Sequence, residues 1–140
     1  MNKLMLCFLI ICLIISCSIA SGEDFARYNT QGHLNGYYWV VMDDITKVAF
    51  IAGWVQGLLF GVTSYDLGED GKLNPKSRNM LDYYIYKRGL ESSDLISAIN
   101  YFYEDPINRK IPISMAIMVL IQKSKGENID KQVEFLRSQQ

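Results

Sequence analysis

The chain has 140 residues, which is enough for one packed domain and too few for two once a leader is set aside. Its 14 basic and 15 acidic side chains give a net charge of −1. Such a balance excludes the clustered basic surface that nucleic-acid-binding domains need. The sequence also has no helix with the basic amphipathic face that is typical of membrane-surface helices. We therefore expect no nucleic-acid partner.

The N-terminus has the layout of a secretory signal peptide: Lys3, an uncharged apolar run over residues 4–15, and then small residues. Cleavage after Ala20 predicts a single helical domain over residues 21–140, located in the periplasm or secreted. The alternative is a lipoprotein anchored at Cys17, because residues 14–17 also resemble a lipobox. A membrane contact is expected only through the signal peptide or that lipid.

Metal and cofactor chemistry has little support in the sequence. The three cysteines all lie in the first 17 residues, and His33 is the only histidine. The domain therefore lacks a disulfide, a thiol nucleophile and a zinc ligand set. Residues 66–77 resemble an EF-hand loop only in part, because Gly68 and Ser77 occupy two ligand positions. We predict no metal, no cofactor and no catalytic residue.

The most distinctive segment is a helix predicted over residues 48–63, in which Gly53, Gly57 and Gly61 recur every fourth residue. Each glycine costs a helix about 1 kcal/mol relative to alanine. We expect the close approach of another helix, the one that carries Ala116, to offset that cost. These three residues are named the glycine stripe.

This helix is apolar nearly all round, with Gln56 as the one polar side chain between residues 48 and 62. Such a helix is either buried or in a membrane. Fifteen residues span about 22 Å, which is short of the roughly 30 Å hydrocarbon core. We therefore predict burial in a soluble core, with Gln56 hydrogen-bonded. A membrane span is the alternative, since the G-x-x-x-G pattern also pairs membrane helices.

The fold class predicted is all-α: a compact single-domain bundle of about five helices around the glycine-striped central helix. The segment over residues 37–42 is expected to dock on the core rather than form a strand. Caps and prolines set the helix starts, and glycine or Asp-Pro sets the ends. The expected starts are Asp43, Asn74, Ser92 or Ser93, Ile111-Pro112, and Asn128 or Asp130; the expected ends include Gly89, Asp105-Pro106 and Gly126. Apolar spacing predicts which faces of the last three helices are buried. These faces are Leu95, Ile96, Ile99, Phe102 and Tyr103, then Met115, Ile117, Met118, Val119, Leu120 and Ile121, and last Val133, Phe135 and Leu136, which dock the final helix on the core.

Residues 101–109 are the best candidate for a binding site, because aromatic, acidic, amide and guanidinium groups gather there around a helix end and a loop. The competing interpretation is structural. In it, Phe102 and Tyr103 pack in the core, while Asp105 and Asn108 cap helix ends.

One family resemblance joins several of these positions: Trp39, Lys47, Gly53, Gly57, Phe102-Tyr103, Asp105, Asn108, Ile111-Pro112 and Ala116. The arrangement resembles small, exported, all-helical bacterial proteins. More distantly it is similar to the periplasmic immunity proteins that neutralise the amidase effectors of type VI secretion. The resemblance implies a compact helical domain that binds a protein. Those immunity proteins usually carry a disulfide, which residues 21–140 of this chain lack.

Two functions follow as hypotheses. The first is a non-enzymatic interaction protein of the bacterial envelope, an immunity-like inhibitor with a protein partner there. The second is a protein that binds a small ligand or a cell-wall glycan, or an enzyme on such a substrate, with Glu104, Asp105 or Asp44 as the acid. The thin catalytic inventory favours the first. The candidate binding residues are Trp39, Lys47, Tyr103, Asp105, Asn108 and Arg109.

Overall fold

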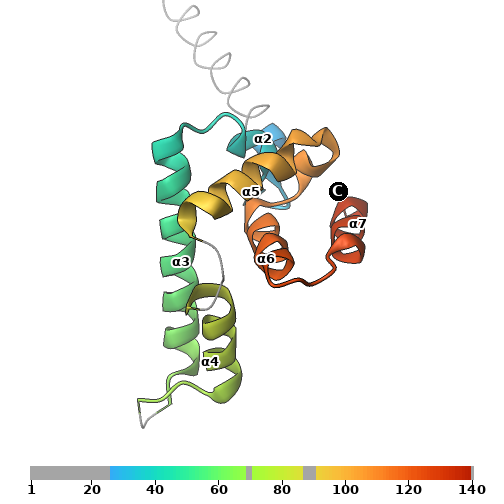
Figure 1. Cartoon of the computed structure of the whole chain (residues 1–140). Helices are drawn as coiled ribbons and strands as arrows, with labels where there is room; N and C mark the ends of the chain where they lie inside the picture. Colours follow the sequence, from blue (N-terminus) through green and yellow to red (C-terminus); the bar gives the residue numbers. More distant parts are fainter. Residues whose placement is uncertain (1–25, 69–70, 87–90, 140) are drawn as a thin grey trace, which may run out of the picture.

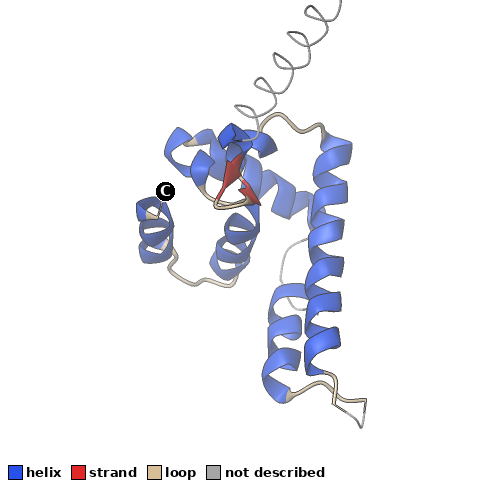
Figure 2. Cartoon of the chain, turned by 180° about the vertical axis from the view of Figure 1, so that it is seen from behind, coloured by secondary structure: helices blue, strands red, loops and turns tan. Residues whose placement is uncertain are grey.

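A chain of short helices and one long helix makes up the computed structural model, which describes residues 26–68, 71–86 and 91–139 (Figure 1). The all-α prediction is confirmed, with one small hairpin added (Figure 2). The expected signal peptide over residues 1–20 and the expected helix end at Gly89 lie outside the described residues. The elements are β1 (Asn29–Thr30), β2 (His33–Leu34), α2 (Gly36–Trp39), α3 (Asp44–Asp66), α4 (Pro75–Leu81), the π-helix η1 (Asp82–Tyr86), α5 (Ser92–Glu104), the 3-10 helix η2 (Pro106–Lys110), α6 (Ile113–Ser124) and α7 (Asp130–Ser138).

Two of the predicted N-caps are confirmed in atomic detail. Asp43 Oδ1 accepts a hydrogen bond from the backbone N–H of Thr46 at 2.6 Å, and this bond lowers the pKa of Asp43. Asn74 Oδ1 accepts from the N–H groups of Lys76 and Ser77 at the start of α4. The cap expected at Ser92 or Ser93 is wrong, because α5 begins directly after Glu91, which makes no side-chain cap.

The segment before α3 docks on the core, as expected, through the short helix α2. A two-residue turn with positive φ at Gln31 and Gly32 reverses the chain between β1 and β2. Asn35 then caps α2, and Trp39 at its end is fully buried. The close approach that glycine permits occurs at Gly36, where an added Cβ would clash with the Tyr103 ring and lie 2.9 Å from Arg109 Cα.

The core is built around α5 and α6, which pack against each other. The apolar spacing of α5 predicts its buried face correctly, since Leu95, Ile99 and Tyr103 are all fully buried. α2 covers one end of this pair and α3 lies along its side (Figure 1). The core residues are Trp39, Met42, Ile51, Leu95, Ile99, Tyr103, Ile113, Ala116, Ile117, Leu120 and Ile121.

The predicted burial of the glycine-striped helix is wrong. α3 contacts α4 and α5, but only Lys47, Ile51 and Val62 are buried along it. An added Cβ at Gly53, Gly57 or Gly61 would meet no atom within 4 Å among the described residues. The helix that carries Ala116 packs in the core instead. Uniform apolar composition therefore did not indicate which side of α3 is covered, and Gln56 is exposed rather than buried.

α3 is also longer than the spacing predicts. Its 23 residues span about 34 Å, so by length and composition alone it could cross a membrane. α4 and α3 lie side by side over the half of α3 that ends at Asp66 (Figures 1 and 2). The N-terminal half of α3 flanks α5. The arrangement makes α3 an outer flank of the molecule rather than its centre.

Candidate interaction site

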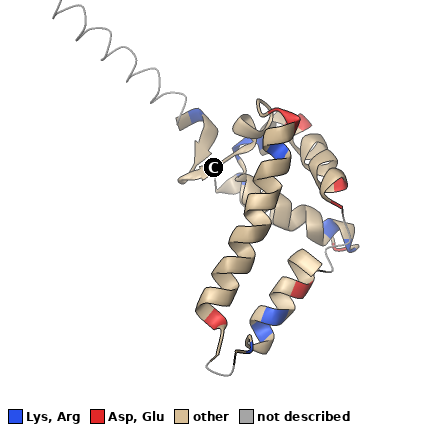
Figure 3. Ribbon diagram, turned by 90° about the vertical axis from the view of Figure 1, so that its left-hand side faces the viewer, with Lys and Arg blue, Asp and Glu red and all other residues tan. Residues whose placement is uncertain are grey.

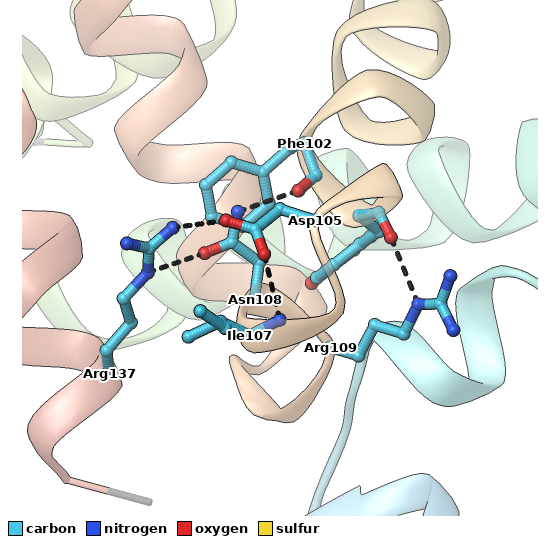
Figure 4. Close-up of polar contacts among 7 residues, drawn as sticks. Phe102, Asp105, Ile107, Asn108, Arg109 and Arg137 are labelled. Carbon is cyan, nitrogen blue, oxygen red and sulfur yellow. Dashed lines mark hydrogen bonds and ion pairs between the residues drawn. The ribbon is translucent and has the colours of Figure 1, made fainter.

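Asp105 and Asn108 form a polar junction where α5 ends and η2 begins (Figure 4). Asp105 Oδ1 accepts from the N–H of Ile107 at 3.0 Å, which caps η2 as the structural interpretation predicts. Asn108 is buried, and its Nδ2 donates to the carbonyl of Phe102 at 2.7 Å near the end of α5. The two side chains thereby satisfy backbone groups that the break between α5 and η2 would leave unpaired.

The same two side chains hold the last helix through Arg137. Arg137 Nη2 lies 2.8 Å from Asp105 Oδ2 as an ion pair, and Arg137 Nε donates to Asn108 Oδ1 at 2.9 Å. Figure 4 shows the guanidinium of Arg137 in contact with an oxygen of Asp105 and the side-chain oxygen of Asn108 from one side. The junction of Asp105, Asn108 and Arg137 is therefore the anchor of α7, and we call it the α7 anchor.

Tyr103 and Arg109 support the same turn from the other side. Arg109 Nε donates to the carbonyl of Tyr103 at 3.1 Å (Figure 4), and the Tyr103 hydroxyl donates to the carbonyl of Ile111 at 3.0 Å. Burial raises the pKa of the Tyr103 hydroxyl well above its usual range. Because Tyr103 is fully buried, its expected contact with an external ligand is not supported, and it is a core residue.

Trp39 and Lys47 form a separate pair beside the core. Trp39 is fully buried and its Nε1 donates to Asn100 Oδ1 at 2.8 Å. Lys47 Nζ lies 5.6 Å from the centroid of the Trp39 ring, within range of a cation–π interaction. Lys47 is itself buried at the N-terminal end of α3. Trp39 therefore acts as the docking residue of α2 rather than as a surface contact.

A pocket of about 410 Å³ opens beside the α7 anchor. Glu104 and Tyr101, both exposed, lie on it together with Asp105 and Lys123. One Asp105 oxygen is occupied by Arg137 and the other by the η2 cap. Glu104 is thus the exposed carboxylate of this pocket, and it makes no hydrogen bond or ion pair with the described residues. In the described part of the chain, no three His, Cys, Asp or Glu side chains gather as a metal site would require.

A second hollow, of about 350 Å³, lies between α6 and α7. Its walls are mainly apolar, and two of the side chains that line it are exposed: Phe135 by 62% and Met115 by 43%. A smaller hollow of about 220 Å³ shares Met115, Phe135 and Leu136 with it and extends toward the hairpin. We call the two together the α6–α7 groove. The larger hollow is lined by Met115, Met118, Val119, Gln122, Lys131, Gln132, Phe135 and Leu136.

The two walls of the larger hollow of the α6–α7 groove come from α6 and α7. No described residue of α7 is buried, although Val133, Phe135 and Leu136 give it an apolar face in the sequence. The chain turns at Gly126, with φ +82°, and α7 is then fixed by the α7 anchor and by a bond from Gln31 Nε2 to the carbonyl of Gln139. Spacing predicted that this face docks on the core, but in the structure Val133 and Leu136 are only half-buried and Phe135 is exposed.

The candidate binding residues thus divide by position. The turn between α5 and η2 is stabilised by Asp105, Asn108 and Arg109. The core contains Trp39 and Tyr103. The groove residues on α6 and α7 were missed because the sequence assigns them to buried faces. Comparisons of the chain with protein-family models, with curated proteins and with solved structures found no match.

Proposed function

We propose that this chain is a non-enzymatic interaction protein of the bacterial envelope, which binds an apolar segment of a partner protein in the α6–α7 groove. The observation that supports the proposal is the groove itself, whose wall helix α7 buries none of its described residues in the protomer. Exposed apolar surface bounded by polar residues is typical of protein interaction sites. The location rests on the signal-peptide pattern of residues 1–20.

The composition of the groove suits a protein ligand. Met115 and Met118 provide flexible, polarizable side chains that adapt to an inserted residue. Phe135 offers an aromatic surface of the kind that dominates interface energetics. Lys131, Gln122 and Gln132 supply the polar part of the lining, so a bound segment meets apolar walls and a polar margin. An inhibitor of the immunity type would use such a surface to hold its target.

Capture from an envelope extract tests the proposal. The tagged full chain should retain one stoichiometric protein in high salt, because apolar contacts are not screened by ions. Phe135→Ala should lose that protein, whereas Glu134→Ala, the neighbouring exposed position on α7, should retain it. Equal retention by the two variants, or no retained protein with the natural chain, would refute binding in the groove.

The pocket beside the α7 anchor favours a second candidate function, the binding of a small ligand or a cell-wall glycan. Its exposed Tyr101 and Glu104 provide a stacking surface and a hydrogen-bond acceptor for a sugar. Muropeptide fragments titrated into the protein should then give saturable heat in calorimetry. Glu104→Gln should weaken that binding, and Glu91→Gln, an exposed acid at the start of α5, should not.

A further inference from the structure

The outer face of α3 is apolar, exposed and free of charge. Between Val48 and Tyr65 the sequence has no charged residue. Figure 3, which faces this flank, accordingly shows α3 in tan, without blue or red, between its two ends. Phe60 is 74% exposed and Val48 is 53% exposed. The outward side of a soluble helix ordinarily carries charged and polar residues. A large exposed apolar face of this kind is typical of a surface that contacts a protein or a membrane.

The shape of this face suits another helix. Ala49, Gly53 and Gly57 recur every fourth residue on the exposed side, flanked by Phe60. An added Cβ at Gly53 or Gly57 meets no atom of the described residues within 4 Å, so this side of the helix is open to an approaching backbone. Packed helices ordinarily lie 8–10 Å apart, and small residues permit the near end of that range.

A lipid bilayer is a poor occupant for this face. α4 and η1 follow α3 in the chain, and α4 lies beside the C-terminal half of α3 (Figures 1 and 2). They carry Lys76, Arg78 and Asp82. If α3 crossed a membrane, these charged side chains would be drawn toward the hydrocarbon beside it, where charges are expensive.

We propose that α3 pairs with α3 of a second copy of this chain. A charge-free face is complementary to itself, because no like charges meet across a two-fold axis. Gln56, exposed in the middle of the face, has both a donor and an acceptor and can bond the partner's Gln56. α3 and α7 lie on opposite flanks of the core in Figure 1, so a dimer formed through α3 leaves the α6–α7 groove open. The pairing does not depend on the function proposed for that groove.

Sedimentation velocity of the full chain over a range of concentrations tests the pairing. The natural chain should form a reversible dimer. Gly57→Arg adds a charge where the protomer has room, and it should raise the dimer dissociation constant ~100-fold, because an unpaired charge would be desolvated in the interface. Ser97→Arg, an exposed position on α5, should leave the constant unchanged. A monomer at every concentration, or equal dimerisation of Gly57→Arg, would overturn the proposal.

Cross-linking provides a measurement that does not depend on the arginine variant folding. With Cys7, Cys12 and Cys17 changed to serine, Gln56→Cys should form a disulfide-linked dimer on mild oxidation, and Ser97→Cys should stay monomeric. Flotation with phosphatidylcholine vesicles tests whether a lipid bilayer, rather than a second copy of the chain, covers the outer face of α3. A chain that is monomeric in solution and floats with vesicles only when Gly57 is unsubstituted would assign the face to lipid and overturn the pairing.

Discussion

Arg137 and Asp105 form an ion pair of 2.8 Å that connects the last helix of the chain to the end of α5. Asn108 accepts a second hydrogen bond from the same guanidinium. Because no described residue of α7 is buried, these contacts have more influence on the position of α7 than a surface ion pair ordinarily has. The candidate site residues Asp105 and Asn108 therefore position the wall of the α6–α7 groove.

Replacement of Arg137 by alanine should release α7 from the end of α5 without unfolding the core. Arg137→Ala is expected to cost about 1–2 kcal/mol, since the ion pair is partly exposed and the bond to Asn108 is more buried. Amide hydrogen exchange over residues 130–138 should accelerate, while exchange in α5 stays slow. Arg78→Ala, on α4, serves as the control. Unchanged exchange in α7 would show that the α7 anchor does not hold it.

Asn108 should matter more to global stability than Arg137. Asn108→Ala leaves the carbonyl of Phe102 without its side-chain donor in a part-buried site, and an unsatisfied buried acceptor costs about 1–3 kcal/mol. Urea unfolding followed by circular dichroism measures the loss, with the exposed Asn79→Ala on α4 as control. A midpoint equal to that of the control would mean that the junction is dispensable.

Substitution by alanine at Gly36 and at Gly57 should change the free energy of unfolding in opposite directions. Gly36→Ala forces a Cβ into the Tyr103 ring and the backbone at Arg109, and such overpacking costs about 1–3 kcal/mol. The Cβ of Gly57→Ala meets no atom of the described residues within 4 Å, and the substitution should add about 0.5–1 kcal/mol to the free energy of unfolding of the protomer, because alanine is the better helix former. Unfolding is measured on dilute protein, so that self-association does not contribute. Destabilisation by Gly57→Ala under these conditions would indicate a covered stripe within the protomer.

The start of α3 should depend on pH through Asp43. The hydrogen bond from the Thr46 N–H lowers the pKa of Asp43 in the folded state. The cap is therefore fully stabilising above the unfolded pKa of about 3.9 and is lost as pH falls through the lower folded value. Over that window the Thr46 amide signal should shift, and its protection factor against hydrogen exchange, relative to the intrinsic rate at each pH, should fall.

Two variants make this pH test specific. Asp43→Asn keeps the cap and should remove its dependence on pH, because asparagine caps a helix without titrating. Asp44→Asn, one residue along, should leave the dependence in place. A Thr46 amide that responds to acid equally in the natural chain and in Asp43→Asn would contradict the assignment.

Local structure was largely predictable because its signals are local. Asp43, Asn74 and Asp105 act as caps, and each was identified from the residues that follow it. The buried face of α5 follows from its apolar spacing in the same way. The two-residue turn at Gln31 and Gly32 has no comparable signal in the surrounding sequence, and the hairpin was not predicted.

Long-range placement was not predictable for α3 and α7. A helix that is apolar all round has the same sequence whether its outward face contacts the rest of the protomer, a partner protein or a membrane. The burial of Gly53 and Gly57 within the protomer was therefore inferred wrongly. α7 has an apolar face that spacing assigns to the core. The α7 anchor ties α7 to the start of η2, and a contact between residues 105 and 137 leaves no periodic signal in the chain.

Site-specific photo-crosslinking in the living cell tests the central claim, partner binding in the α6–α7 groove, most directly. Benzoylphenylalanine in place of Phe135 should form a single adduct with one envelope protein on irradiation. The same label in place of Tyr86, an equally exposed aromatic residue on η1, should give no such adduct. Adducts of the same partner from both positions, or none from position 135, would contradict recognition through the groove.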